Sequence, residues 1–123
     1  MPDLNNDLDL TFLYEIADGS NEFIVESITM FIDQSPDILQ ELGNALTAGN
    51  WAEAALAAHK IKANLGFFGM LNSQSLIQQI ESACKDGTAN GPDLMAKYNQ
   101  VKSLISANLV ALKQIKTEKE NGV

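Results

Sequence analysis

The amino-acid sequence predicts an all-α protein, an antiparallel up-down four-helix bundle with a short additional N-terminal helix. Apolar residues recur at helical spacing in nearly every stretch between the glycines and prolines, and no segment shows the apolar–polar alternation of a strand. The breaks between these stretches are short, and short loops between long amphipathic helices make antiparallel neighbours. Residues 1–123, of which 46% are hydrophobic, are enough for the core of one domain.

Two helices are expected in the first half of the chain. A short apolar face over residues 9–17 ends at Asp18-Gly19, a pair of residues that favours a helix stop. Ser20 or Asn21 can cap the second helix, whose apolar residues keep one face as far as the break at Gly49-Asn50.

Pro36 lies inside this second helical pattern and has two interpretations. It could be the first residue of a new helix that Ser35 caps, or it could kink one long helix. Because the apolar spacing continues beyond the proline as far as Leu46, the sequence favours one bent helix.

Three further helices are expected in the second half. The third spans Trp51–Phe67, and the fourth begins at Asn72 or Ser73 and ends at Lys85. Pro92 opens the last helix in its first turn, and the apolar spacing carries that helix to about Lys116. The polar end of the chain, residues 117–123, is expected to fray.

The charge balance bounds the possible partners. Eight basic against sixteen acidic residues give a net charge of −8, which argues against nucleic acid and anionic lipid. Cys84 is the one cysteine, so no internal disulfide can form, and we expect it to be a small core residue. Neither a signal peptide nor an apolar run of the ~18–20 residues needed to cross a bilayer is present. We therefore expect a cytoplasmic, monomeric protein without a membrane partner.

His59 is the only histidine, and the helical period turns it away from the expected core. At about 100° per residue it points roughly 140° from the centre of the apolar stripe of the third helix. Because it faces water, His59 is not expected to be a hydrogen-bonded core residue. Its unusually small helical neighbours distinguish it from a typical exposed histidine. The apolar stripe consists of Trp51, Ala54, Ala58, Ile61, Leu65 and Phe68.

The small neighbours of His59 favour a docking surface over a surface histidine without a task. Ala55 and Ala63 lie four residues before and after it, and Gly66 follows one turn later. Lys62 lies on the same side of the helix at i+3. Its ammonium group disfavours the imidazolium, keeps the ring nucleophilic and could stabilise an anion on it, unless this lysine is merely solvated.

The fourth helix brings two polar residues to the height of His59. If this helix folds back about a turn near Met70, Glu81 is as far from the turn as His59, and Gln78 lies one turn nearer. Either side chain could accept a hydrogen bond from the ring and fix its orientation, although both could also be ordinary solvated positions.

The segment HKIKANLGFFG, from His59 to Gly69, resembles the signature of histidine phosphotransfer (HPt) domains. In that signature an apolar residue follows the histidine by two positions, a lysine by three and a glycine by ten, with small residues after the lysine. The resemblance extends over residues 23–87 and includes LIQQIESACKDG of the fourth helix, whereas the last helix matches in type only. Relatives commonly have glycine where this chain has Ala63 and serine where it has Asn64, so docking should be adjusted rather than lost.

The resemblance implies a phosphocarrier of a two-component phosphorelay. His59 would accept a phosphoryl group from the phospho-aspartate of a receiver domain or from a histidine kinase, and would pass it to a receiver aspartate. Lys62 would stabilise its charge, and Gln78 and Glu81 would orient the imidazole. The implied docking surface consists of Ala55, Lys60, Ala63, Asn64 and Gly66.

The sequence also bears on cofactors and on other classes of function. It contains no P-loop, kinase-type glycine-rich loop or carboxylate cluster for Mg²⁺. We therefore expect that the chain binds no cofactor or metal of its own and that Mg²⁺ is bound by the receiver. We also expect a phosphocarrier rather than an enzyme. A silent helical adaptor is the alternative. One histidine and no E-x-x-H pair argue against a metal-binding bundle. A hydrolase is disfavoured because no Cys–His or Ser–His–Asp set can assemble around a surface histidine without a pocket. Met1 and the polar end favour a free-standing protein over a domain of a hybrid kinase.

Overall fold

The structure, a computed structural model, describes residues 7–121 and arranges them as five α-helices. No strand occurs among these residues, and the all-α fold class predicted from the sequence is confirmed. The helices are α1 (Thr11–Ala17), α2 (Asn21–Ala48), α3 (Trp51–Phe67), α4 (Leu71–Asp86) and α5 (Gly91–Glu120).

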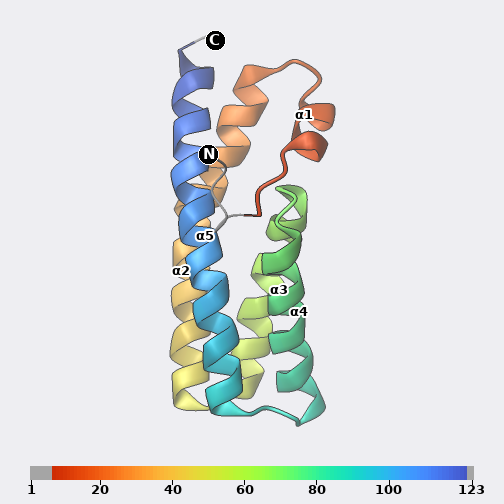
Figure 1. The fold of residues 1–123 in the computed structure, drawn as a ribbon, viewed down its shortest axis with the longest axis vertical. Helices are drawn as coiled ribbons and strands as arrows, with labels where there is room; N and C mark the ends of the chain where they lie inside the picture. Colours follow the sequence, from red (N-terminus) through yellow and green to blue (C-terminus); the bar gives the residue numbers. More distant parts are fainter. Residues whose placement is uncertain (1–6, 122–123) are drawn as a thin grey trace.

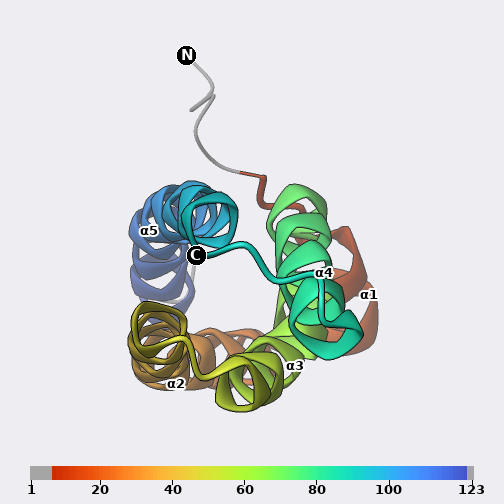
Figure 2. The ribbon, with the colours of Figure 1, turned by 90° about the horizontal axis from the view of Figure 1, so that it is seen from below.

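The four longer helices stand at the corners of a square, and each packs against the next in chain order, with α5 closing the square against α2 (Figure 2). The pair α2 and α5, with 28 and 30 residues, is much longer than α3 and α4, with 17 and 16. The α3–α4 hairpin therefore covers only part of the long pair, and α1 lies beyond the hairpin turn and packs against α2 (Figure 1).

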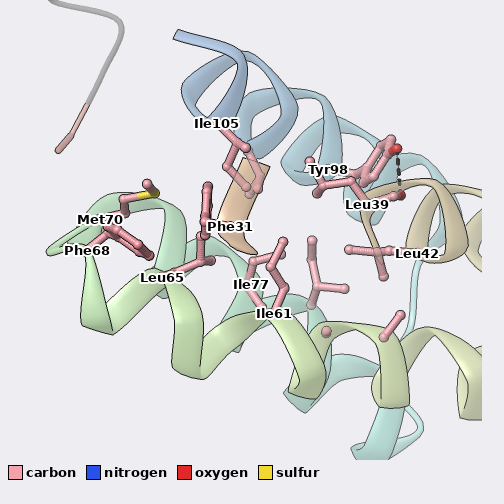
Figure 3. Packing of buried hydrophobic residues seen from close by; sticks show 14 of the residues in the cluster. Phe31, Leu39, Leu42, Ile61, Leu65, Phe68, Met70, Ile77, Tyr98 and Ile105 are labelled. Carbon is pink, nitrogen blue, oxygen red and sulfur yellow. Dashed lines mark hydrogen bonds between the residues drawn. The ribbon is translucent and has the colours of Figure 1, made fainter. Parts of the chain in front are cut away.

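The core fills the space between the four helices (Figure 3). The inner face of α3 is the predicted apolar stripe, and Ala54, Ala58, Ile61 and Leu65 are each 0% exposed. Because the apolar residues of α3 point inward at helical period, the opposite side of the same helix is available for polar side chains. Residues from the other helices complete this core, among them Ile28, Leu42, Ile77, Ile80, Leu94, Ile105 and Leu112.

Pro36 lies inside α2, which continues through it as one helix, so the interpretation as a single helix is confirmed. Ser35 does not cap a new helix. Its side chain is completely buried, and its hydroxyl oxygen has no hydrogen-bond partner within residues 7–121. Burial of Leu39 and Leu42 on the far side of the proline keeps the helix attached to the core.

Helix α4 begins at Leu71, one or two residues before the predicted start. Its N-cap residue, Met70, is buried and provides no side-chain hydrogen bond. The cap comes instead from Asp7, whose carboxylate accepts hydrogen bonds from the Ser73 backbone N–H at 2.7 Å and from its hydroxyl at 3.2 Å. The same carboxylate accepts a hydrogen bond of 2.8 Å from the buried amide of Asn108 on α5. The N-terminal segment thus joins α4 to α5.

Helix α5 continues to Glu120, so the expectation that it ends at about Lys116 is wrong. The expected fraying of residues 117–123 is also wrong for the residues that belong to this helix, 117–120. Lys116 and Glu120 form an ion pair of 2.9 Å at i,i+4 spacing, which supports the last turn. The Lys119 ammonium also lies 5.4 Å from the centre of the Tyr14 ring of α1. The last two residues lie outside the described range.

The Asp7 cap makes a prediction about stability. Asp7→Ala leaves the Ser73 N–H and the buried Asn108 amide without this acceptor, so we expect a free energy of unfolding lower by about 1–3 kcal/mol. Urea denaturation of the wild type and the variant measures the difference. Asp37→Ala, at an exposed position of α2, is the matched control. Equal stabilities of the two variants would contradict the capping role.

Candidate functional site

The candidate site is built on the outer side of α3, where His59 projects from the bundle. The His59 side chain is 67% exposed, as the helical period predicts, although it is flanked by buried residues on the inner face. Its Nδ1 atom lies 3.1 Å from Oε2 of Glu81, which belongs to α4. The ring is therefore held at one nitrogen by the neighbouring helix while most of its surface stays open.

Glu81 is a buried carboxylate that contacts three potential hydrogen-bond donors. Its side chain is only 3% exposed. Lys62 of α3 donates to Oε1 at 2.6 Å, and Lys85, one turn along α4, donates to Oε2 at 2.8 Å. Together with His59, these lysines surround the carboxylate. A buried charge is tolerated when it is paired and hydrogen-bonded in this way.

The charge of Glu81 determines which ring nitrogen of His59 acts as the hydrogen-bond donor in this cluster. Burial raises the pKa of the Glu81 carboxyl, but hydrogen bonds from Lys62, Lys85 and His59, with the charge of Lys62, outweigh burial and lower this pKa to about 2. Glu81 is thus ionised at neutral pH and can only accept hydrogen bonds. Nδ1 of His59 is therefore the donor in this contact, and in the neutral tautomer that fits it the lone pair lies on Nε2.

Gln78 contacts Lys62, whereas the sequence offered the imidazole of His59 as its possible partner. Its Oε1 atom accepts a hydrogen bond of 3.0 Å from Lys62, and its amide donates to Ser82 at 2.9 Å. Of these two candidate partners for the imidazole, the structure places Glu81 against the ring and Gln78 against the lysine. Lys62 is therefore held by two acceptors from α4, with 26% of its side chain exposed.

Three of the expected docking residues are at least partly exposed. Lys60 and Ala63 are exposed, and Lys60 forms an ion pair of 3.2 Å with Glu41 of α2. Asn64 is half-buried and lines a shallow pocket between α2 and α3 together with Phe67. These positions remain available to a partner.

Ala55 and Gly66, the other two residues of the expected docking surface, are less exposed than Lys60 and Ala63. Ala55 is only 7% exposed. A Cβ atom at Gly66 would lie 2.6 Å from the side-chain amide nitrogen of Gln74, and that amide donates a 3.3 Å hydrogen bond to the Lys62 carbonyl. The small size of Gly66 therefore makes room for the Gln74 side chain of α4.

Two residues of the site were not identified from the sequence. Lys85 could have been found from its i,i+4 spacing to Glu81, which is typical of an ion pair on a helix. Leu56 is 57% exposed, one turn before His59, and carries no chemical signal of its own. Both line a hollow beside the histidine, together with Ala52, Ala55, His59 and Cys84.

Cys84 is half-buried and packs against the core, in agreement with its expected role as a small packing residue. Burial raises the pKa of its thiol, so the reactive thiolate is disfavoured. Within residues 7–121, no group of three or more His, Cys, Asp and Glu side chains is arranged to hold a metal ion. None of the described helices combines the length and the apolar character needed to span a bilayer.

The fold and the site together define a class of protein: an antiparallel helical bundle that presents one exposed histidine, anchored by a buried carboxylate and flanked by lysines. The model of the Hpt domain family matches residues 26–115, and the chain therefore belongs to the Hpt domain family. The match reaches into the last helix and so extends beyond the region of resemblance that the sequence motifs cover.

The same fold occurs in a solved structure. The crystal structure of the HPT domain from the Hpt sensor hybrid histidine kinase of Shewanella superposes with a TM-score of 0.65 and 22% sequence identity, over 97% of this chain and 94% of that chain. A comparison with curated proteins gives no match. Membership of the family gives the chain a phosphotransfer role in two-component systems, in which such domains carry phosphoryl groups.

The charge of Glu81 makes a prediction about pH dependence. Because its pKa is lowered from 4.5 to about 2, the carboxylate stabilises the fold fully above pH 4.5, and this contribution is lost as the pH falls towards 2. The shift corresponds to about 3 kcal/mol. We expect the difference in unfolding free energy between the wild type and Glu81→Gln to shrink over this range.

Denaturant titrations at a series of pH values from 7 to 2 measure this difference. Glu26→Gln, at an exposed position of α2, is the control and should show no comparable change with pH. A wild type and a Glu81→Gln variant that lose stability in parallel on acidification would show that the carboxylate is not held by its three donors.

Proposed function

We propose that this chain is a phosphocarrier whose His59 accepts a phosphoryl group on Nε2 from a receiver phospho-aspartate or a histidine kinase and passes it to a receiver aspartate. One observation carries the proposal: the ionised Glu81 carboxylate lies 3.1 Å from Nδ1 and directs the lone pair to Nε2 on an exposed ring. A neutral imidazole nitrogen with a free lone pair is a good nucleophile.

The proposed transfer needs one bond to form and one to break. The Nε2 lone pair attacks the phosphorus, the Nε2–P bond forms, and the P–O bond to the aspartate breaks with release of its carboxylate. The ring becomes cationic because Nδ1 keeps its proton, and the Glu81 carboxylate at 3.1 Å stabilises this charge. Transfer to an acceptor aspartate is the reverse reaction.

Lys62 and Lys85 supply the positive charge that the phosphoryl group requires. Both ammonium groups lie at the carboxylate that holds the ring, at 2.6 Å and 2.8 Å from its two oxygens. Phosphoryl transfer depends mainly on in-line positioning and on charge stabilisation, and fixed cations serve the second need. Mg²⁺ is expected on the receiver.

The surface around His59 suits an acidic receiver pocket. Residues 1–59 contain no lysine or arginine, whereas Lys60, Lys62 and Lys85 all lie near the histidine. The small side chain of Ala63 leaves room for a partner near the ring, and the exposed Leu56 offers that partner an apolar contact. The proposed partners are therefore receiver domains or a hybrid histidine kinase.

The phosphoacceptor is tested by incubating the protein with a phosphorylated receiver and Mg²⁺. We expect an acid-labile, base-stable phosphate on the wild type and none on His59→Gln, which changes an exposed side chain and should leave the fold intact. Phosphate on the variant would reject His59 as the acceptor. An unphosphorylated wild type that still binds the receiver would favour the adaptor alternative.

The role of Lys62 is tested by the rate of the same transfer. Lys62→Ala removes a fixed cation beside the ring, and we expect the rate to fall on the order of ten- to a hundredfold. Lys97→Ala is the matched control, because Lys97 is also 26% exposed and paired with one acidic residue, Asp93, far along the chain on α5. Equal rates for the two variants would exclude charge stabilisation by Lys62.

A further inference from the structure

Gly66 and Gln74 form a contact between α3 and α4 that the proposed chemistry does not use directly. The Gln74 side chain extends from α4 towards α3. A Cβ atom at position 66 would lie only 2.6 Å from the amide nitrogen of Gln74. From there the amide donates a 3.3 Å hydrogen bond to the backbone carbonyl of Lys62. The missing side chain of Gly66 is thus what gives Gln74 access to the backbone of α3.

This contact lies in line with the residues that hold the Lys62 ammonium. Gln74, Gln78 and Glu81 follow one another on α4 at spacings of four and three residues, so they share one side of that helix. Gln74 holds the backbone of Lys62, while Gln78 and Glu81 hold its Nζ atom at 3.0 Å and 2.6 Å. One stripe of α4 therefore holds this lysine at both of its ends.

We infer that Gln74, seated over Gly66, is a positioning residue that fixes Lys62 beside His59 for phosphoryl transfer. The inference rests on the proposed function, in which Lys62 stabilises the phosphoryl group. Gln74 touches neither the ring nor the phosphoryl group in this mechanism and acts through the position of the lysine. Glycine is required at position 66 so that the amide can reach the carbonyl.

The inference separates activity from stability, because alanine is favoured over glycine inside a helix. Gly66→Ala meets the flexible end of the Gln74 side chain, which can move aside at little cost to the fold. We expect a midpoint of thermal unfolding equal to or above that of the wild type. The rate of His59 phosphorylation should nevertheless fall roughly fivefold, the equivalent of one lost hydrogen bond.

The experiment uses phosphoramidate as a small phosphodonor, so that docking of a protein partner does not enter the rate. The Nε2–P bond forms while the P–N bond of phosphoramidate breaks and ammonia leaves. Gln74→Met keeps a side chain of similar length without the donor and should show the same loss. The Gly66→Ala, Gln74→Met double variant should be no slower than either single variant, because all three lack the same hydrogen bond.

Two controls match the two substitutions. Gly91→Ala fills open space at the start of α5, and Gln79→Met changes an exposed glutamine of α4, so both should retain the wild-type rate. The ¹⁵Nζ resonance of Lys62 gives a readout that a merely structural role would not move. We expect it to be distinct from those of exposed lysines in the wild type and to shift towards them in Gly66→Ala and Gln74→Met.

The outcomes distinguish this inference from the proposed function. A wild type that takes up no phosphate on His59 would overturn the proposed function, while the Lys62 resonance would still test the contact. A wild type that is phosphorylated, with Gly66→Ala and Gln74→Met equal to it in rate and in the Lys62 resonance, would overturn the inference alone. Slower variants whose unfolding midpoints fall in proportion would also overturn it, because that result indicates a structural role.

Discussion

The geometry of the site depends on the contacts that the buried Glu81 carboxylate makes with its three donors. A carboxylate with 3% exposure is costly unless nearby donors replace its lost hydration, and Lys62, Lys85 and His59 do so. Two of these donors come from α3, so α3 and α4 must stay within hydrogen-bonding distance at this height. The orientation of the imidazole thus follows from the same requirement that keeps the hairpin together.

Two glycines near the end of α3 allow other segments to approach this hairpin closely. Gly66 admits the Gln74 amide, and near the turn Gly69 has a φ of +67° and no space for a Cβ atom, because the backbone of Asp9 passes over it. The Asp9 N–H donates to the Phe68 carbonyl at 3.2 Å, which fixes the N-terminal segment across the hairpin turn. The segment before α1 and the α3–α4 turn therefore support the hairpin at its turn (Figure 1).

Periodicity was enough to predict the helices and the outward direction of His59, because each depends on the angle between neighbouring residues of one helix. It could not predict contacts between segments. The cap of α4 comes from Asp7, which is 66 residues away from Ser73, and no local signal marks it. The same limit applies to Gly66, whose contact with Gln74 of α4 has no local signal in the sequence. Counting residues from a turn placed Gln78 and Glu81 at the right height but could not decide which one meets the ring.

The arrangement suits a carrier that must release the phosphoryl group as well as accept it. In the proposed transfer, Glu81 stabilises the cationic ring of phosphohistidine, and the lysines stabilise the phosphoryl oxygens. In the proposed transfer the phosphoryl oxygens and the Glu81 carboxylate would share the two ammonium groups, which lie 2.6 Å (Lys62) and 2.8 Å (Lys85) from the carboxylate. The stabilisation of the phosphoryl oxygens would therefore be offset by weaker ion pairs at the Glu81 carboxylate. In the proposed mechanism we expect this competition to limit the stability of phosphohistidine, which a carrier must give up again.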